Sequence, residues 1–463
     1  MATSVNAKQA LAAIWQLGPM PLEALAHAKL GGAEPVLPSS FAVGTAAQVP
    51  IAAAALAACE LGYARGQRRQ DVGVDMQHAA LECVGWFSAD GRVPEIWDKF
   101  SGLYRCANGW VRVHANFAHH RDGALRLLGL APATAQRADA ERALLAWRAL
   151  DFEQAAADSG LVVAALRRFD EWDRHPQGQA VAAQPLLSFE RIGDAPRNSL
   201  PRLAANQRPL SGLRVLDLTR ILAGPACGRA LAAYGAEVML LNAPHLPNIE
   251  SIASTSRGKL SAQLDLRTDK GREDLNRLLA SSHVFVQGYR PGALEALGYS
   301  PQALAQRKPG IVCVSLSAYG SEGPWRARRG FDSLVQTAMG FNHAEAETAG
   351  TAEPKALPMQ ILDYATGHLM AFAAAAALWR QMHEGGSWHV RVSLAQTGHW
   401  IRSLGRVPGG SQAAWPDRQA YLETSQSGFG ELVAVRHSAQ LSLTPACWTR
   451  PSVPPGTDPP AWP

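Results

Sequence analysis

The apolar positions from residue 206 onward fall into short runs divided by glycine and proline. Leu213–Leu218 alternates and is rich in β-forming residues, which predicts a strand, and Ala236–Leu241 is a second buried strand by the same criteria. Between them, Cys227–Tyr234 has a helical pattern that follows a Gly-Pro pair and ends at Gly235. This order of strand, helix and strand predicts a βαβ unit and therefore a parallel sheet.

Later apolar runs continue the same pattern. His283–Val286 and Ile311–Leu316 are predicted strands, and helical segments lie between them. We therefore predict an α/β fold in which residues 206 to about 400 form a doubly wound, Rossmann-like parallel sheet.

The stretch before this region has a different pattern. Gly109–His114 is a predicted strand after an Asn-Gly turn, and Ala140–Leu150 and Phe152–Leu166 are predicted helices. Residues 186–209 contain prolines with polar neighbours, which is typical of a linker. These features predict a smaller α+β domain before the larger one.

Two alanine-rich segments predict an internal repeat. Each combines an alanine-rich helix, a glycine-containing turn and a short strand. The two segments are Ala52–Ala80 and Ala371–Gly398. Aligning Val72 with Val390 gives an offset of 318 in the numbering (390 − 72), which places Thr45 at the position of Asp363. The predicted units are a partial, degenerate copy of the large domain (1–84), a small α+β domain with its linker (85–205), the large domain (206–415) and an extended, proline-rich C-terminal tail (416–463).

The composition is that of a soluble globular protein. The 463 residues are 47% hydrophobic and 18% charged, and the net charge of +5 comes from scattered basic residues, so no nucleic-acid footprint is expected. The six cysteines form no Cys-x-x-Cys pair, which fits reduced thiols in the cytoplasm. We find no signal-peptide pattern, and the most apolar stretch, Leu369–Trp379, is too short to cross a bilayer, so no membrane partner is expected.

Asp363 is the first candidate for chemistry, because it opens an alanine-rich apolar run. The first turn of a helix favours negative charge through its free N–H groups and its dipole. A carboxylate there can stay ionised in a partly dry site and act as a nucleophile. A plain N-cap role is the alternative.

The turn after the first predicted strand argues against a dinucleotide cofactor. Leu218–Gly228 contains glycine but lacks the Gly-x-Gly-x-x-Gly pattern, and the second strand ends at Asn242, where a ribose-binding acid would be expected. A tight turn without a ligand is the alternative interpretation.

Several sequence blocks occur in one order between Leu213 and Gly367. They are Leu213–Pro225 with Tyr234–Val238, Ser256–Lys259 before Leu264–Thr268, Gly288–Gly298, Ser317–Gly320 with Gly323 and Pro324, Gly330–Asp332, and Asp363 with Thr366 and Gly367. Together they resemble the family III CoA-transferases, of the formyl-CoA and carnitine CoA-transferase type. Leu103–Val111 is similar to the family's small-domain entry strand. In ordinary members that domain follows the large one, so the chain resembles a rearranged or fused variant.

The resemblance implies that Asp363 is a nucleophile that moves CoA from an acyl-CoA thioester to an acceptor carboxylate, through aspartyl anhydride and aspartyl-CoA intermediates. It implies coenzyme A or an acyl-CoA as substrate, a small carboxylic acid as the second substrate, no permanently bound cofactor and a homodimer. The candidate CoA contacts are Ala223, Gly224, Tyr289, Arg290 and Arg329. The candidate residues of the acyl pocket or its support are Phe331, Asp332 and Gly367.

Two alternatives stay open beside the transferase. A 2-methylacyl-CoA racemase needs an acid/base pair, and that branch of the family has a histidine where this chain has Phe331, which cannot move a proton. A catalytically silent acyl-CoA-binding subunit is suggested by the truncated first copy. His119 and His120, next to each other after a predicted strand, would point to opposite faces of it, so a structural or surface role is favoured over a metal site.

Overall fold

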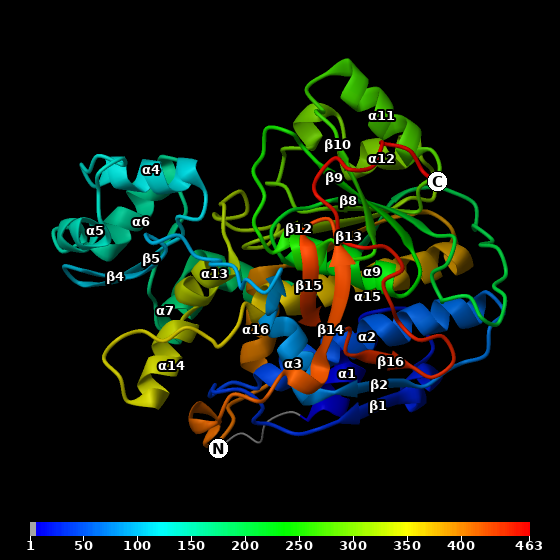
Figure 1. Cartoon of the computed structure of the whole chain (residues 1–463), viewed down its shortest axis with the longest axis horizontal. Coiled ribbons are helices and arrows are strands. Elements are labelled where there is room, and N and C mark those ends of the chain that lie inside the picture. Colours follow the sequence, from blue (N-terminus) through cyan, green and yellow to red (C-terminus); the bar gives the residue numbers. More distant parts are fainter. Residues whose placement is uncertain (1–5) are drawn as a thin grey trace.

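The computed structural model describes residues 6–463, and its largest element is a seven-stranded sheet flanked by helices (Figure 1). The strand order is β10-β9-β8-β11-β12-β13-β7, and every pairing is parallel except that of β7 with β13. The strands are β7 (Ser188–Gly193), β8 (Arg214–Leu218), β9 (Glu237–Asn242), β10 (Lys259–Gln263), β11 (Val284–Gln287), β12 (Val312–Ser317) and β13 (Ser387–Ser393). The predicted α/β class with a parallel sheet is confirmed.

Helices cover the faces of this sheet and follow its strands. They are α9 (Ala223–Ala233), α10 (Ile252–Thr255), α11 (Asp269–Leu279), η2 (Glu295–Leu297), α12 (Pro301–Arg307), α13 (Asp332–Met339), α14 (Phe341–Ala349), α15 (Ile361–Glu384) and α16 (Leu394–Ser403). Helix α9 begins four residues before the predicted Cys227. The Gly-Pro pair lies in its first turn, where the missing N–H of proline costs no hydrogen bond.

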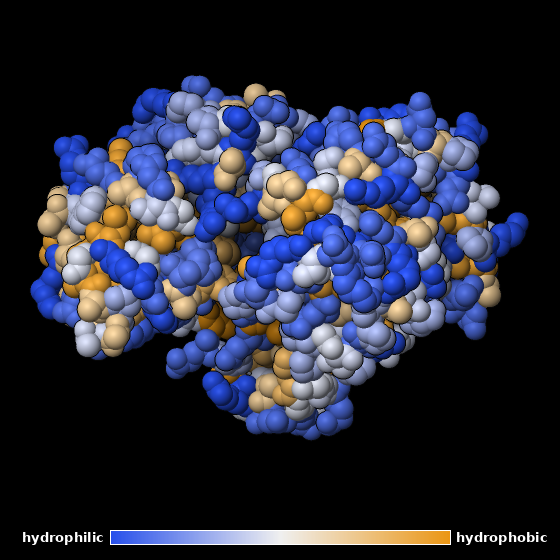
Figure 2. Space-filling model, turned by 90° about the horizontal axis from the view of Figure 1, so that it is seen from above, coloured by the Kyte–Doolittle hydropathy of each residue, from blue (hydrophilic) through white to orange (hydrophobic). Residues whose placement is uncertain are grey.

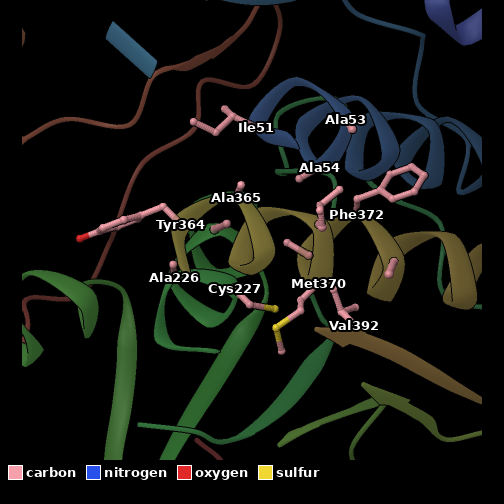
Figure 3. Close-up of a cluster of buried hydrophobic side chains, with 14 of the residues drawn as sticks. Ile51, Ala53, Ala54, Ala226, Cys227, Tyr364, Ala365, Met370, Phe372 and Val392 are labelled. Carbon is pink, nitrogen blue, oxygen red and sulfur yellow. The ribbon is translucent and has the colours of Figure 1, made fainter. Parts of the chain in front are cut away.

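Helix α15 lies in the centre of the core, with α2 (Val43–Ala64) on one side and α9 on the other (Figure 3). Ala53 and Ala54 of α2 lie across from α15, and Ala226 of α9 lies on the opposite side (Figure 3). These short side chains let the helices approach closely. Helices α2 and α15 are both long and apolar enough to cross a membrane, but they are buried in the protein. The stretch Leu369–Trp379 was predicted to be too short to cross a membrane. That length was wrong, because the helix that contains it starts at Ile361.

A small unit with its own core precedes the large sheet and lies to one side of it (Figure 1). Its elements are β4 (Gly102–Cys106), β5 (Gly109–Val113), α4 (Ala118–Leu127), α5 (Arg137–Leu144), α6 (Ala149–Asp158) and β6 (Val163–Ala165). The predicted helix over 152–166 was wrong in its second half. Gly160 adopts a left-handed φ of +69°, and the valines that follow form β6 against β5. The helix over 140–150 was also wrong, because α5 ends at Leu144 and α6 is a separate helix.

Helices α7 (Phe169–Arg174) and α8 (Pro176–Ala182) connect the small unit to residues 186–209. This predicted linker contains β7, which closes one edge of the large sheet.

The N-terminal and C-terminal segments combine into two small sheets. The first contains β1 (Ala28–Gly31), β2 (Val72–Asp75) and β16 (Ala439–Leu441), with α1 (Ala7–Trp15), η1 (Leu22–His27) and α3 (Met76–Val84) beside it. The second contains β3 (Phe87–Ala89), β14 (Leu422–Ser427) and β15 (Gly430–Val435). Residues 416–463 are therefore not an extended tail throughout. A turn between Ser427 and Gly430 allows a hairpin, and most prolines of the segment lie after it.

The same order of elements occurs twice at a constant offset in the numbering. Helices α2 and α15 begin at positions 43 and 361, and α3 and α16 begin at positions 76 and 394, so the offset is 318 for both pairs (361 − 43 and 394 − 76). The intervening strands end at Asp75 and Ser393, which gives the same offset of 318 (393 − 75). Each strand has one parallel and one antiparallel neighbour: β2 lies between β1 and β16, and β13 lies between β12 and β7.

Candidate active site

A cleft of about 400 Å³ lies where the small unit meets the carboxyl ends of the large sheet. Figure 2 shows the molecule from above, with a recess between the lobe at the left and the rest of the surface. Seven segments line the cleft: the start of α4, the turn after β8, the loops after β9, β11 and β12, and the starts of α15 and α16. The carboxyl edge of a parallel sheet is where open α/β folds bind their ligands.

Asp363 contributes the carboxyl group of this cleft. It is the third residue of α15, it lines the cleft, and it is 8% exposed. Its carboxyl oxygens accept no hydrogen bond from any residue in the described range 6–463. The plain N-cap role is therefore excluded, and the carboxyl group is free to meet a ligand.

Asp332 takes the capping role instead. This buried residue, at the start of α13, accepts a hydrogen bond at Oδ2 from the backbone N–H of Asp363 at 2.9 Å. The free N–H groups of α15 therefore serve Asp332 and not Asp363 itself. Gln336 donates to the other oxygen of Asp332 and fixes its orientation.

Burial raises the proton affinity of both carboxyl groups, and Asp332 raises that of Asp363 further. Burial raises the pKa of Asp332 to about 7, partly offset by the hydrogen bonds that it accepts. Burial and the nearby Asp332 hold the pKa of Asp363 well above its usual range. This direction runs against the expectation that the helix start keeps Asp363 ionised, because burial and the charge of Asp332 favour its protonated form.

Glycines bring the surrounding backbone close to Asp363. A Cβ on Gly367 would lie 2.4 Å from the carbonyl oxygen of Ala223, so this glycine lets α15 contact the first turn of α9. A Cβ on Gly224 would lie 2.3 Å from the Cβ of Thr219. Neither glycine lines the cleft, but both are needed for its shape.

The turn between β8 and α9 is strained at one residue. Ile221 lines the cleft with a φ of +77°, a left-handed conformation that is a clear outlier for a β-branched side chain. Such a conformation costs on the order of 1–3 kcal/mol and persists where the surroundings enforce it. The strain presents Leu222 and Ala223 to the cleft at the start of α9.

Four arginines line the cleft: Arg220, Arg290, Arg328 and Arg329. Arg328 lies 3.9 Å from Glu153, whereas no carboxylate of residues 6–463 lies within 4.0 Å of the other three. Arg329 is held in place by donating to the carbonyl oxygen of Gly160 at 2.8 Å, across the junction with the small unit. The cleft is therefore a strongly cationic environment in which three of the four arginines lack a counter-charge, which suits an anionic ligand.

An aromatic group closes the cleft near Phe331. The ring of Phe331 stacks on His114 with centroids 3.9 Å apart, and Phe117 lies 6.1 Å from the same ring. His119 and His120 also line the cleft. They lie at the start of α4 and not on a strand, so the expectation that they point to opposite faces was wrong.

Burial lowers the pKa of His114 and of His120 to about 3, so both imidazoles are neutral at physiological pH. Across the described range 6–463, no three His, Cys, Asp or Glu side chains are grouped to hold a metal ion.

A second, more apolar recess of about 210 Å³ adjoins the cleft. The two share four lining residues: Leu218, Leu246, Tyr289 and Ala293. Asp363 lines the cleft but not the recess, whereas His245 and Arg267 line only the recess, so the recess extends the cleft beyond the four shared residues.

Most of the predicted site residues come together in the structure. The six that line the cleft are Ala223, Tyr289, Arg290, Arg329, Phe331 and Asp363. Gly224, Asp332 and Gly367 lie behind it, in the contacts described above.

The sequence did not point to Arg220, His119 and His120 as cleft residues. Arg220 lies within the glycine-containing turn after the first predicted strand, and this position could have indicated that it lines the cleft. The histidines belong to the small unit, and nothing in their local sequence indicates contact with the large sheet.

Comparison with known proteins gives a match over the same region. The family model described as CoA-transferase family III matches residues 210–405. The probable fatty acyl-CoA transferase Rv3272 of Mycobacterium tuberculosis is 34% identical over 201 residues, which are 40% of this chain and 50% of that protein. The formyl-CoA:oxalate CoA-transferase of Streptomyces coelicolor is 32% identical over 214 residues, 43% of this chain and 50% of that protein.

One further relative and one solved structure show the same partial coverage. The succinate–glutarate CoA-transferase of Agrobacterium fabrum is 30% identical over 40% of this chain and 51% of that protein. The crystal structure of Rv3272 in its orthorhombic form has a TM-score of 0.40 and 33% identity, over 43% of this chain and 56% of that one. The chain thus spans about half the length of these relatives.

Proposed function

We propose that the protein moves CoA from an acyl-CoA thioester to an acceptor carboxylate, with Asp363 as the nucleophile. The match of residues 210–405 to the model of CoA-transferase family III supports this proposal. The observation that carries this proposal is the buried carboxyl group of Asp363, which has no hydrogen-bond partner among residues 6–463 and lines a cationic cleft.

The proposed reaction proceeds in four attacks. A carboxylate oxygen of Asp363 attacks the thioester carbonyl carbon, the C–S bond breaks, and CoA thiolate leaves a mixed anhydride behind. The thiolate attacks the aspartyl carbonyl, which releases the donor acid and forms aspartyl-CoA. The acceptor carboxylate then displaces the thiolate to give a second anhydride. Finally the thiolate attacks the acceptor's carbonyl, which yields the new thioester and frees Asp363. Together these steps replace one difficult exchange by easier acyl transfers.

The surroundings of Asp363 support this chemistry. A carboxylate that has left water is poorly solvated, and the ionised form of Asp363 is a strong nucleophile for that reason. The backbone N–H groups of the first turn of α9, at Leu222 and Ala223, belong to residues that line the same cleft and suit the developing oxyanions.

We place CoA in the cleft and the adjoining recess, with its thiol end towards Asp363. The arginines at Arg220, Arg290 and Arg329 would bind its phosphates, and the apolar recess beside Tyr289 would take the nucleotide base. The acyl group would then lie beside Phe331 and Phe117. Phosphate contacts from arginines without a counter-charge are consistent with a substrate of several negative charges.

The repeat supports one catalytic centre in each chain. We interpret α2-β2-α3 as a degenerate copy of α15-β13-α16, because their bounds agree at one offset and their strands have matching neighbours. The nucleophile's position is Thr45 in the first copy. On this view the units 1–84, 85–205, 206–415 and 416–463 are parts of two fused copies. The resemblance to the family, and not the repeat, is the basis for proposing a homodimer of such chains.

Trapping of the intermediate tests the proposal. The protein is incubated with an acyl-CoA and hydroxylamine, or in ¹⁸O-labelled water, and then digested and analysed by mass spectrometry. Modification at Asp363 is the expected result. A silent acyl-CoA-binding subunit would bind the thioester without any modification of Asp363, and this outcome would refute the transferase.

Racemase activity is the second enzymatic candidate, because His119 and His120 line the cleft with Asp363. Burial lowers the pKa of His120 to about 3, which makes it a weak base. We therefore expect no α-proton exchange when a 2-methylacyl-CoA is incubated with the protein in deuterated water. Exchange that disappears in a His120→Ala variant would reverse the ranking.

A further inference from the structure

The three-stranded sheet β1-β2-β16 has one edge that no described residue covers. The backbone of β1 pairs with β2 on one side, Gly31 accepts one bond from the side chain of Gln48, and Ala28 donates back to Leu25 in the preceding turn. Within residues 6–463 no other group bonds to the β1 backbone. The edge strand β10 of the large sheet, in contrast, is partly covered. Ser261 N–H donates to the carboxylate of Asp458, and Asp458 N–H donates to the carbonyl oxygen of Ser261, both at 2.8 Å.

The repeat indicates what belongs beside β1. In the second copy, β12 is the parallel neighbour of β13, and its other edge pairs in parallel with β11. In the first copy, β1 is the parallel neighbour of β2, and no strand of the described residues takes the position of β11. The strand that fills this position in the second copy is Val284–Gln287, a short apolar strand.

A groove of about 620 Å³ runs along this edge and has the properties of a strand-binding site. Its apolar lining comes from α1, η1 and β1, through Leu11, Leu25 and Leu30. Two lysines, Lys8 and Lys29, line the same groove, and none of its lining residues is acidic. Lys29 Nζ lies 4.0 Å from Asp71, which is half-exposed and already bonded to His27.

We propose that the edge of β1 and this groove bind an extended segment of a partner polypeptide. The segment lies parallel to β1, carries apolar residues at alternate positions and has acidic residues at its ends. Backbone hydrogen bonds to the strand edge give the affinity, and the lysines select the acidic flanks. A second copy of this chain is disfavoured as the donor, because its apolar strands of this type are paired on both sides within the large sheet.

This inference depends on the proposed repeat and is independent of the transferase activity. The probe is a synthetic peptide of Val-Phe-Val-Gln, the sequence of β11, with two glutamates at each end; a scrambled peptide of the same composition is the control. We expect saturable binding by fluorescence anisotropy, and slower hydrogen exchange of the amides of residues 28–31. Asp363→Ala should bind the peptide like the unaltered protein, so loss of transfer and loss of docking are distinguishable.

Variants at the groove complete the test. The double change Lys8→Glu with Lys29→Glu should weaken binding at least about tenfold through charge repulsion, whereas Arg68→Glu, at an exposed position outside the groove, should not. Ala26→Trp fills the groove from an exposed position and should abolish binding without unfolding the protein. Absence of peptide binding would overturn the proposal. So would protection of residues 28–31 in a dimer of the protein alone, since a second copy would then cover the edge.

Discussion

The starts of α2 and α15 allow a comparison between a helix end without a cleft and the one that carries the proposed nucleophile. The two helices occupy equivalent places in the repeated order of elements, and both have a backbone N–H at the third position bonded to a carboxylate. Glu34 accepts from Thr45 at 2.7 Å, and Asp332 accepts from Asp363 at 2.9 Å. The capping device is therefore common to both helices. The difference is the side chain at the capped position and the cleft in front of it.

The largest expected contrast is between Asp363→Ala and Thr45→Ala. Loss of a covalent nucleophile should lower the rate of CoA transfer by about 10³-fold or more, while Thr45→Ala should leave the rate within about twofold, since Thr45 lines neither the cleft nor the adjoining recess. Transfer is measured with purified protein and a panel of thioesters, and calorimetry should show that Asp363→Ala still binds CoA. An active alanine variant at 363 would remove the basis of the assignment.

The next contrast concerns the contact of α15 with α9. Gly367 corresponds to Val49 in α2 (367 − 318), so Gly367→Val installs the residue of the first copy. Its Cβ would meet the carbonyl oxygen of Ala223, and the overpacking should cost on the order of 1–3 kcal/mol of unfolding free energy. Urea unfolding measures this cost, and transfer should fall because Asp363 and Ala223 move apart.

Val49→Ala is the matched control for that change. It creates a cavity in a fully buried position of α2 and should also destabilise the protein by about 1–3 kcal/mol. Transfer should nevertheless be retained at temperatures where the variant is folded. Equal loss of transfer in both variants would mean that the first copy is part of the catalytic unit.

A smaller effect is expected at the cleft's arginines. Arg329 lines the cleft and bonds across to Gly160, whereas Arg326 is exposed and does not line it. Arg329→Ala should raise the KM for acyl-CoA by about tenfold with little change in kcat, as expected for a lost phosphate contact. Arg326→Ala should change neither constant. Arg329→Lys should restore part of the affinity for acyl-CoA, because lysine keeps the positive charge but lacks the planar guanidinium that binds a phosphate through two hydrogen bonds.

The sequence predicted the parts of the molecule that depend on local pattern. The βαβ unit after Leu213 has apolar periodicity and turn residues that leave few alternatives, and its strands begin and end close to their predicted limits. Strand β6 was missed because its residues gain their strand conformation from pairing with β5. Strand β7 was missed for the same reason, in a stretch whose prolines suggested a linker.

The candidate site also has features that the local sequence predicts and features that depend on packing. The sequence singled out Asp363, which lines the cleft, because a carboxylate at the start of an alanine-rich helix is unusual. The raised pKa of Asp363 could not be foreseen, because it arises in part from Asp332, which is brought next to it by the packing of α13 against α15. The histidines of α4 enter the cleft through the position of the whole small unit, and no local pattern encodes that position.

The finest test of the comparison changes both capping carboxylates, as Asp332→Asn and Glu34→Gln. In the proposed reaction Asp363 attacks as a carboxylate, so transfer should rise with pH as this group ionises. Asp332 should shift that rise to higher pH, because it raises the pKa of Asp363. The amide introduced by Asp332→Asn still accepts the N–H of Asp363 through its oxygen but carries no charge. We therefore expect the acid limb of kcat/KM to move to lower pH, whereas Glu34→Gln should leave the profile unchanged.

Stability should respond with the same sign. A carboxyl group whose pKa is raised on folding binds protons more tightly in the folded state, so its contribution is favourable at low pH and is lost as pH rises from about 4, the unfolded value, through the folded value. For Asp332 the folded value is about 7, and burial also raises the pKa of Glu34. Asp332→Asn and Glu34→Gln should each reduce the loss of unfolding free energy between pH 5 and pH 8, measured by urea titration.

The two measurements together separate the capping role that both helices share from the tuning of the proposed nucleophile. Both variants should flatten the dependence of stability on pH, whereas only Asp332→Asn should shift the dependence of activity on pH. An activity shift in Glu34→Gln, or none in Asp332→Asn, would contradict that separation.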